Sequence, residues 1–113
     1  MSDLTQQKCE ACRADAPRVT LDESKELLKQ IPEWEIMPQD SIDRLTRIFK
    51  FDDYLEAVSF SNKVAELAEE EDHHPSILLE WGQVEVNWWT HKIGGLHKND
   101  FISAAKTDVI FNT

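Results

Sequence analysis

The chain has 113 residues, of which 41% are hydrophobic and 30% are charged, and its formal net charge is -10 at pH 7. This length suits one domain with a single core, and the composition excludes a disordered chain. The acidic excess opposes binding to nucleic acid or anionic lipid, and no apolar stretch reaches the roughly 18 residues that span a bilayer. Because the polar N-terminus also lacks the apolar core of a signal peptide, we expect a cytoplasmic protein with no nucleic-acid or membrane partner.

Residues 1–18 lack a periodic apolar pattern, so we expect a flexible leader ahead of a single domain over residues 19–113. The leader carries both cysteines, Cys9 and Cys12, as a C-x-x-C pair. A structural zinc site needs four ligands, and a thioredoxin-type pair opens a helix after a strand; the sequence offers neither context. Two reduced thiols on a flexible arm are therefore favoured over a zinc site completed by a histidine or by another subunit.

Three helices alternate with two hairpins along the expected domain. Thr20 and Glu23 form a capping-box pattern ahead of the first helix, and Pro32 ends this helix. Asp53 and Asn99 are the expected N-caps of the second and third helices. The elements are predicted, in chain order, over residues 21–31, 34–37, 42–51, 54–70, 77–81, 84–91 and 99–110.

The two hairpins are expected to turn at 38–40 and at the pair Gly82-Gln83. Consecutive hairpins that are divided by helices favour a four-stranded antiparallel sheet with the helices packed on one face. The sequence therefore predicts the α+β fold class, as a two-layer sandwich.

All four histidines lie between positions 73 and 97, beside an acidic run at 69–72. Imidazole both donates and accepts protons near neutral pH, so converging histidines suit a reaction that moves protons on two sides of a substrate. His73 and His74 stand at a helix-to-strand junction, where Pro75 favours extended backbone. Adjacent side chains of an extended segment point to opposite sides, and no zinc-enzyme motif occurs, so we expect no metal centre. A solvated surface position is the alternative for each histidine.

The second hairpin is expected to end at His91, with Glu85, Asn87 and Trp89 at alternate positions on one face. The residues between them are expected to face the core. Polar groups beside an aromatic plate suit a flat, polar ring system, or equally a solvent face or a subunit contact. Asp100 opens the last helix, where the helix dipole alone favours a carboxylate. The same carboxylate can orient an imidazole or accept a hydrogen bond from a substrate.

These residues combine into one pattern: Glu69-x-x-x-His73-His74-Pro75, then Trp81, then Thr90-His91-x-x-x-Gly95-Leu96-x-x-x-Asp100. The pattern closely resembles the pterin-4a-carbinolamine dehydratase (4a-hydroxytetrahydrobiopterin dehydratase) family. The resemblance runs from about residue 21 to the C-terminal helix, and every position of the pattern matches. The two cysteines lie outside it.

The resemblance implies dehydration of 4a-hydroxytetrahydropterin, which aromatic amino acid hydroxylases release, to quinonoid dihydropterin and water. It implies no metal and no redox cofactor. Water leaves C4a when an acid protonates the hydroxyl while a ring-nitrogen proton is removed, and histidines can supply both groups. By analogy, the catalytic set is His73 and His91 for acid and base work, His74 for holding the pterin, and Asp100 for orientation or substrate hydrogen bonding.

The resemblance also suggests residues that line the substrate. Glu69 is expected to bind the amino-pyrimidine edge, with a role in capping the polar end of the helix as the alternative. Trp81 and Trp89 are expected to pack on the pterin, with core or interface positions as the alternative. His97 falls outside the pattern, and we expect it at the surface.

A second function, as a binding module, stays open beside the enzyme. Members of the family also act as dimerisation cofactors of a transcription regulator, and some relatives serve as assembly factors. The full set of His73, His74, His91 and Asp100 favours the enzyme, because a scaffold needs no groups for proton transfer. A histidine-based metal protein is a third hypothesis. The family further implies a homodimer or homotetramer, built through sheet edges or helices.

Overall fold

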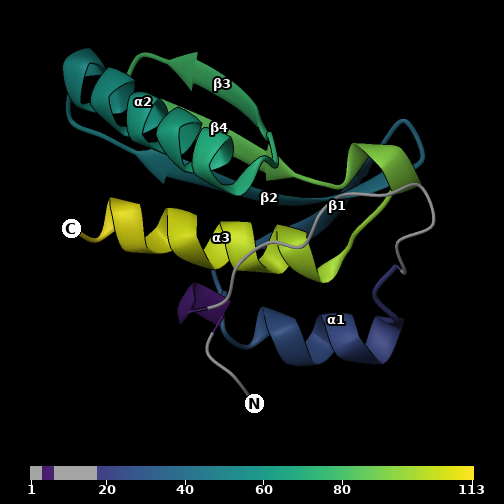
Figure 1. Cartoon of the computed structure of the whole chain (residues 1–113). Coiled ribbons are helices and arrows are strands. Elements are labelled where there is room, and N and C mark those ends of the chain that lie inside the picture. The colour runs from purple at the N-terminus through teal and green to yellow at the C-terminus, as the bar shows by residue number, and fades with distance from the viewer. Residues whose placement is uncertain (1–3, 7–17) are drawn as a thin grey trace.

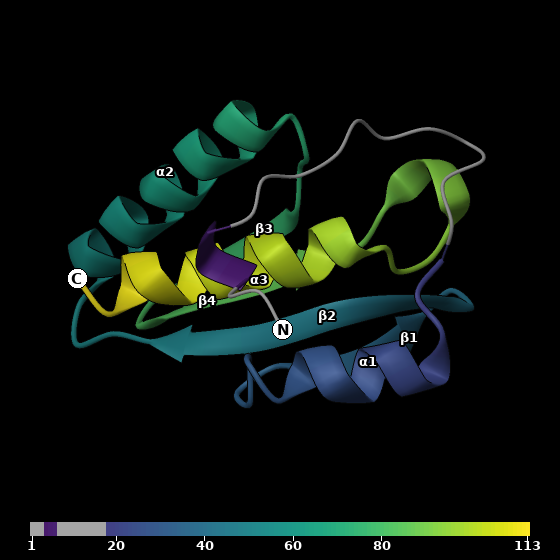
Figure 2. The ribbon, with the colours of Figure 1, turned by 60° about the horizontal axis from the view of Figure 1, so that its bottom comes forward.

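The computed structural model describes residues 4–6 and 18–113, and these residues form two layers (Figures 1 and 2). One layer is a four-stranded antiparallel sheet, and the three α-helices lie together on one side of it, which confirms the α+β prediction. The elements are η1 (Leu4–Gln6), α1 (Leu21–Leu28), β1 (Glu35–Gln39), β2 (Ile42–Lys50), α2 (Tyr54–Glu71), β3 (Ser76–Glu80), β4 (Gln83–Trp88), η2 (His91–Ile93) and α3 (Lys98–Phe111). No helix in these ranges has the length and apolar character that a membrane span requires.

The strand order is β1-β2-β4-β3, so each hairpin contributes one central strand and one edge strand. Strands β2 and β4 pair in the middle of the sheet, where Leu45 lies opposite Trp88. Alternation along β4 buries Val84, Val86 and Trp88 completely against the helices, as the sequence predicts. The opposite face of the sheet carries the polar members of the same strand.

Phe49 of β2 marks the centre of the core. Its ring contacts Phe60 of α2 at 4.6 Å, Phe111 of α3 at 4.9 Å and Trp34 at 5.9 Å between centroids. Offset and edge-on aromatic contacts of this kind add to the burial of apolar area. The core therefore ties both long helices to the central strands.

Local hydrogen bonds explain the helix starts. Thr20 and Glu23 make the reciprocal bonds of a capping box at α1, and Asp53 accepts from the backbone N–H of Glu56 at α2. Both caps confirm the sequence prediction. The start of α3 differs, because His97 and not Asn99 is its N-cap.

Both hairpin turns differ from the expected positions by one or two residues. The first turn consists of Asp40 and Ser41, both with positive φ, and the second consists of Trp81 and Gly82. Two-residue hairpin loops accommodate positive φ because this matches the twist of the paired strands. Consequently Gln83 belongs to β4 and not to the turn.

Leu4, in the segment that we expect to be a flexible leader, is part of the hydrophobic core. Its side chain is completely buried, and its backbone N–H donates to Gln30 Oε1 at 3.0 Å. A single buried leucine leaves no periodic signal, so the pattern did not reveal it. Cys9 and Cys12 lie outside the described residues.

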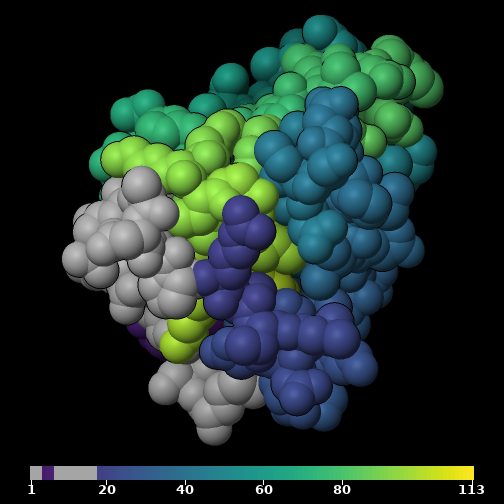
Figure 3. Space-filling model, turned by 90° about the vertical axis from the view of Figure 1, so that its right-hand side faces the viewer, coloured from purple at the N-terminus to yellow at the C-terminus, as the bar shows by residue number. Residues whose placement is uncertain are grey.

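The segment that precedes α1 lies against the segment that leads into α3 (Figure 3). Here the backbone N–H of Val19 donates to the carbonyl of Leu96 at 3.0 Å. The start of the first helix is therefore next to the loop that carries His91, although the two are far apart in sequence.

Candidate active site

The end of α2 sets the directions of His73 and His74. Asp72 adopts the left-handed conformation that commonly ends helices, and the N–H of His73 still donates to the carbonyl of Ala68 at 3.1 Å. Pro75 then forces an extended path. As a result His73 turns into the core with 3% of its surface exposed, whereas His74 is exposed. The two rings point apart, as the sequence predicts.

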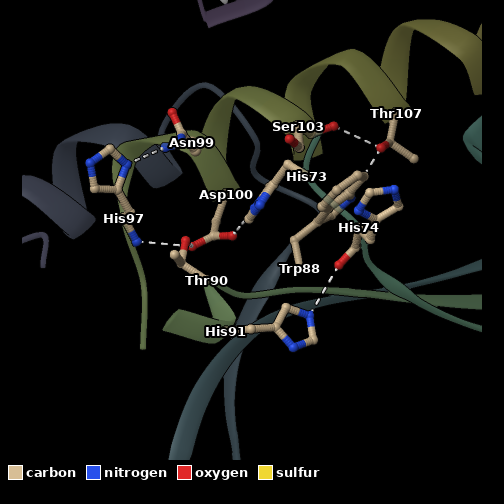
Figure 4. A network of polar contacts seen from close by, with 10 residues as sticks. All are labelled: His73, His74, Trp88, Thr90, His91, His97, Asn99, Asp100, Ser103 and Thr107. Carbon is tan, nitrogen blue, oxygen red and sulfur yellow. Dashed lines mark hydrogen bonds and ion pairs between the residues drawn. The ribbon is translucent and has the colours of Figure 1, made fainter. Parts of the chain in front are cut away.

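Asp100 lies at the centre of a buried polar network (Figure 4). Its Oδ1 is 2.6 Å from Nε2 of His73, and its Oδ2 accepts from Thr90 Oγ1 and from the backbone N–H of His97, both at 2.9 Å. No part of Asp100 is exposed. Both carboxylate oxygens are engaged inside the protein, so the geometry favours orientation of His73 over direct contact with a substrate.

The ring of His73 stacks on Trp88, with 5.4 Å between the ring centroids and 21° between the planes. Trp88 is itself fixed, because its Nε1 donates to Thr107 Oγ1 at 3.2 Å and this hydroxyl donates to the carbonyl of Ser103 at 2.7 Å. A chain of contacts from α3 thus holds the imidazole in one orientation. Such fixed groups are typical of sites in which a proton must move along a set direction.

His74 and His91 form the exposed part of the site. Nε2 of His91 lies 3.2 Å from the carbonyl oxygen of His74, and Nε2 of His74 lies 3.0 Å from Glu69 Oε1. The side chains of His74 and Glu69 are 53% and 81% exposed, so water screens their ion pair. Two imidazoles and a carboxylate are therefore accessible within one small area.

The position of His91 differs from the sequence prediction. Strand β4 ends at Trp88, and His91 begins the short turn η2. Its ring contacts Trp89 at 4.4 Å between centroids, and the guanidinium of Arg44 lies over the same Trp89, 3.8 Å from its ring centroid. Sequence analysis did not identify Arg44, because no local pattern indicates which strand residue lies beside Trp89.

The polar face of β4 is largely satisfied within the sheet. Asn87 donates to Glu85 Oε2 at 3.1 Å and accepts from Thr46 Oγ1 at 2.6 Å. This leaves Trp89 as the member of that face that contacts a site histidine. Fewer groups on this face are therefore available to bind a flat ring system than the alternation of residues along the strand predicts.

Trp81 does not join the histidines within this chain. It occupies the turn between β3 and β4 and is 75% exposed. The other end of that hairpin, where Ser76 lies opposite Asn87, is the end that adjoins the site.

His97 was expected at the surface, and this expectation is wrong. Only 6% of the residue is exposed, and its Nδ1 accepts from the backbone N–H of Asn99 at 3.0 Å. Asp100, three residues later, bonds back to the N–H of His97, which completes a capping box with histidine in place of serine or threonine. The spacing H-x-x-D at a helix start was the available signal.

Within residues 4–6 and 18–113, no group of three or more histidine, cysteine, aspartate or glutamate side chains is placed to hold a metal ion. The described groups instead suit acid and base chemistry. A buried imidazole that contacts a carboxylate is adjacent in the chain to an accessible imidazole, and this second residue contacts a third, also accessible, imidazole.

Comparison with known proteins points to one family. The family model described as pterin 4 alpha carbinolamine dehydratase matches residues 17–110. Relatives from Saccharophagus degradans and Marinobacter nauticus are each 60% identical over 111 residues, covering 98% of this chain and 98% and 100% of theirs. Both carry the provisional name pterin-4-alpha-carbinolamine dehydratase.

Two solved structures share the fold. A transcriptional coactivator/pterin dehydratase from Brucella melitensis is 33% identical with a TM-score of 0.75, over 83% of this chain and 98% of that one. A pterin dehydratase-like protein, described as a RuBisCO assembly factor in the alpha-carboxysome, is 23% identical with a TM-score of 0.59, over 69% of this chain and 88% of that one. The second likeness concerns the fold alone. With the family model and the 60% identical relatives, these findings show that the chain belongs to the pterin-4-alpha-carbinolamine dehydratase family.

Proposed function

We propose that this protein is a hydro-lyase that dehydrates 4a-hydroxytetrahydropterin to quinonoid dihydropterin and water. The observation that carries the proposal is the meeting of His74 and His91 at the surface, with His74 directly following the buried His73 that contacts Asp100. Membership of the dehydratase family supports it.

The reaction needs one proton delivered and one removed. An acid protonates the hydroxyl at C4a, the carbon–oxygen bond breaks, and water leaves while a base takes the proton from a ring nitrogen. No electrons are exchanged with another molecule. A protonated imidazole can deliver the first proton, and a neutral imidazole can take the second. After both steps the protein holds as many protons as before.

We assign acid and base work at the substrate to the exposed His91. The other proton transfer is assigned to His73, which Asp100 orients. His74 holds the pterin, and Glu69 accepts from its amino-pyrimidine edge, since most of that carboxylate is accessible. Trp89 packs beside the ring system. Trp81 has no part in this assignment, because it lies at the other end of its hairpin.

The test follows the ultraviolet time course of 4a-hydroxytetrahydropterin that phenylalanine hydroxylase generates in situ. Loss of a well-placed acid or base lowers turnover by about a hundredfold to ten-thousandfold, so His91→Ala is expected to lower kcat by at least about a hundredfold. His74→Ala is expected to raise KM more than it lowers kcat. The matched control is Trp81→Ala, an exposed aromatic residue away from the histidines, with activity within about twofold of wild type.

A loss of less than about threefold in His91→Ala contradicts the role of His91. No acceleration by the folded wild-type protein contradicts the enzyme and favours the alternative of a non-catalytic dimerisation or assembly cofactor. Quenching of tryptophan fluorescence by a pterin separates these outcomes, because Trp89 contacts His91 and a scaffold without a pterin site shows no quenching.

We also propose that the protein works with an aromatic amino acid hydroxylase in the cytoplasm, as a homodimer or homotetramer. The support for assembly is that, among the residues that the structure describes, β1 and β3 each end the sheet with one unpaired side. Light scattering of the purified protein measures the number of subunits, and a monomer contradicts the proposal.

A further inference from the structure

The turn that carries His91 has little regular structure of its own. His91–Ile93 is a single 3₁₀ turn, and it is closed by the N–H of Thr90 to the carbonyl of Gly95 at 2.9 Å and by the N–H of Gly94 to the carbonyl of His91 at 3.3 Å. Gly94 has a φ of 60°. A catalytic side chain on such a turn is oriented only as well as the turn itself is fixed.

One end of this turn is fixed by the buried network. The hydroxyl of Thr90 donates to Asp100, and Thr90 is 1% exposed. The position of the residue just before His91 is therefore determined by α3. The residues after His91 need a separate contact.

Arg18 supplies that contact from the segment ahead of α1. Its Nη2 donates to the carbonyl of Ile93. A Cβ atom built on Gly95 would lie 3.3 Å from Arg18 Nε and 3.4 Å from Arg18 Cδ, and one on Gly94 would lie 3.8 Å from Nη2. The arginine side chain thus lies flat across two residues that have no side chain, and the bond from Val19 to Leu96 continues the same contact.

In Figure 3 the blue segment at the start of α1 lies directly on the yellow-green segment that leads into α3. His91 itself contacts the ring of Trp89 and the carbonyl of His74. The turn is therefore held between the buried network at Thr90 and the guanidinium at Ile93.

We propose that Arg18 is a positioning residue that acts through His91, in that it fixes the second half of the turn and so the place of the imidazole beside Trp89 and His74. The expected effect of Arg18 on catalysis rests on the proposed function. Arg18 itself touches the turn two to four residues after His91.

The first experiment measures kinetics of Arg18→Met, which keeps a long side chain over the glycines and removes the donor. Because misplacement of a catalytic group by about 1 Å can cost up to a hundredfold, kcat is expected to fall about tenfold, with KM within about twofold. Arg18→Lys, which can still donate to Ile93, is expected to recover about half of the loss on a logarithmic scale. The matched control is Lys25→Met, which removes the same charge from the exposed side of α1. Its kcat is expected to equal that of the wild type.

A double-mutant cycle tests whether Arg18 acts through His91. In the His91→Ala background, Arg18→Met is expected to lower the residual kcat by less than about twofold, since the effects of two residues that are coupled through a shared backbone segment are not additive. The same tenfold loss in both backgrounds overturns the proposal, and so does wild-type activity in Arg18→Met. Thermal unfolding of each variant shows whether a loss follows from instability.

A second measurement does not depend on enzyme activity. The ring current of Trp89 displaces the Hε1 resonance of His91, and this resonance is expected to move toward its position in an unstructured peptide in Arg18→Met but not in Lys25→Met. An unmoved resonance overturns the inference even if the protein is a dehydratase. A moved resonance in a protein without dehydratase activity supports the positioning and contradicts the proposed function alone.

Discussion

Two aspartates about two turns apart on α3 show how one residue type takes two different roles. Asp100, at the start of the helix, is completely buried and bonds to an imidazole, a hydroxyl and a backbone N–H. Asp108 is half-buried and accepts from Trp34 Nε1 at 2.8 Å and from Arg47 Nη1 at 2.6 Å.

The partners decide what each carboxylate can do. Indole and guanidinium only donate hydrogen bonds, and arginine keeps its charge at every pH of interest, so Asp108 is part of a fixed tie between α3 and β2. The imidazole of His73 can gain or lose a proton. Asp100 is therefore coupled to a group that can take part in chemistry, and Asp108 is not.

The strongest test of this comparison is Asp100→Asn. An amide oxygen in the place of Oδ2 still accepts from Thr90 and from the N–H of His97, but an NH₂ group then replaces the carboxylate oxygen that faces Nε2 of His73, so the imidazole loses its charged acceptor. We expect kcat to fall by about a hundredfold and the free energy of unfolding to fall by about 2 to 3 kcal/mol. Dehydratase kinetics and urea denaturation measure these changes.

Asp108→Asn is the matched control, and its kcat is expected to stay within about twofold of wild type. Equal losses of activity in both variants would show that the two ends of α3 do not differ in function.

A smaller effect, on stability alone, is expected for Arg47→Met. The methionine keeps apolar contact with Phe49, over whose ring the guanidinium lies at 4.3 Å, and it removes the charged donor to Asp108. The free energy of unfolding should fall by about 2 kcal/mol, because a hydrogen bond to a charged partner is lost from a half-buried site. Urea denaturation measures the loss, while unchanged kcat confirms that this tie is separate from the histidines. A tenfold loss of kcat argues against that separation.

The smallest expected effect is the pH dependence that Asp108 contributes. Burial raises the pKa of Asp108 above its usual value of 3.8, and the hydrogen bond from Trp34 and the charge of Arg47 oppose this change. Between the usual and the raised pKa the native state binds more protons than the unfolded state, so stability falls as pH rises through this range. The contribution is under about 1 kcal/mol, because the carboxylate is partly solvated.

This contribution is measured as the difference in unfolding free energy between wild type and Asp108→Asn, from about pH 3.5 to about pH 7. The unfolding free energy of the wild type, relative to that of Asp108→Asn, should fall as pH rises. A shift in its favour means that the charged form of Asp108 is the stabilised one.

Sequence reasoning predicted best what depends on neighbouring residues. The capping box of Thr20 and Glu23 and the cap at Asp53 need only local hydrogen bonds, and the alternation along β4 follows from strand geometry. The opposite directions of His73 and His74 follow in the same way from an extended backbone. Short stretches of sequence determine these parts of the fold and site.

The predictions that failed depend on distant contacts or on a shift of one residue. The burial of His97 follows from the packing of α3 on the rest of the fold, and no periodic pattern includes an isolated loop residue. Trp81 moved from the expected strand to the turn, because the turn lies one residue earlier. Neither Arg44 beside Trp89 nor Arg18 beside Gly95 could be paired without the sheet order and the path of the chain.

The order of the strands has a consequence for how the protein folds. The pairing of β2 with β4 joins segments that are separated by all of α2 and β3, whereas Glu69, His73, His91 and Asp100 lie in the stretch from α2 to α3. Loop closure makes distant pairings slow and local ones fast. The histidine cluster can therefore assemble from its own hairpin and two helices early in folding. The later pairing of β2 with β4 adds Arg44, and the docking of the segment ahead of α1 adds Arg18.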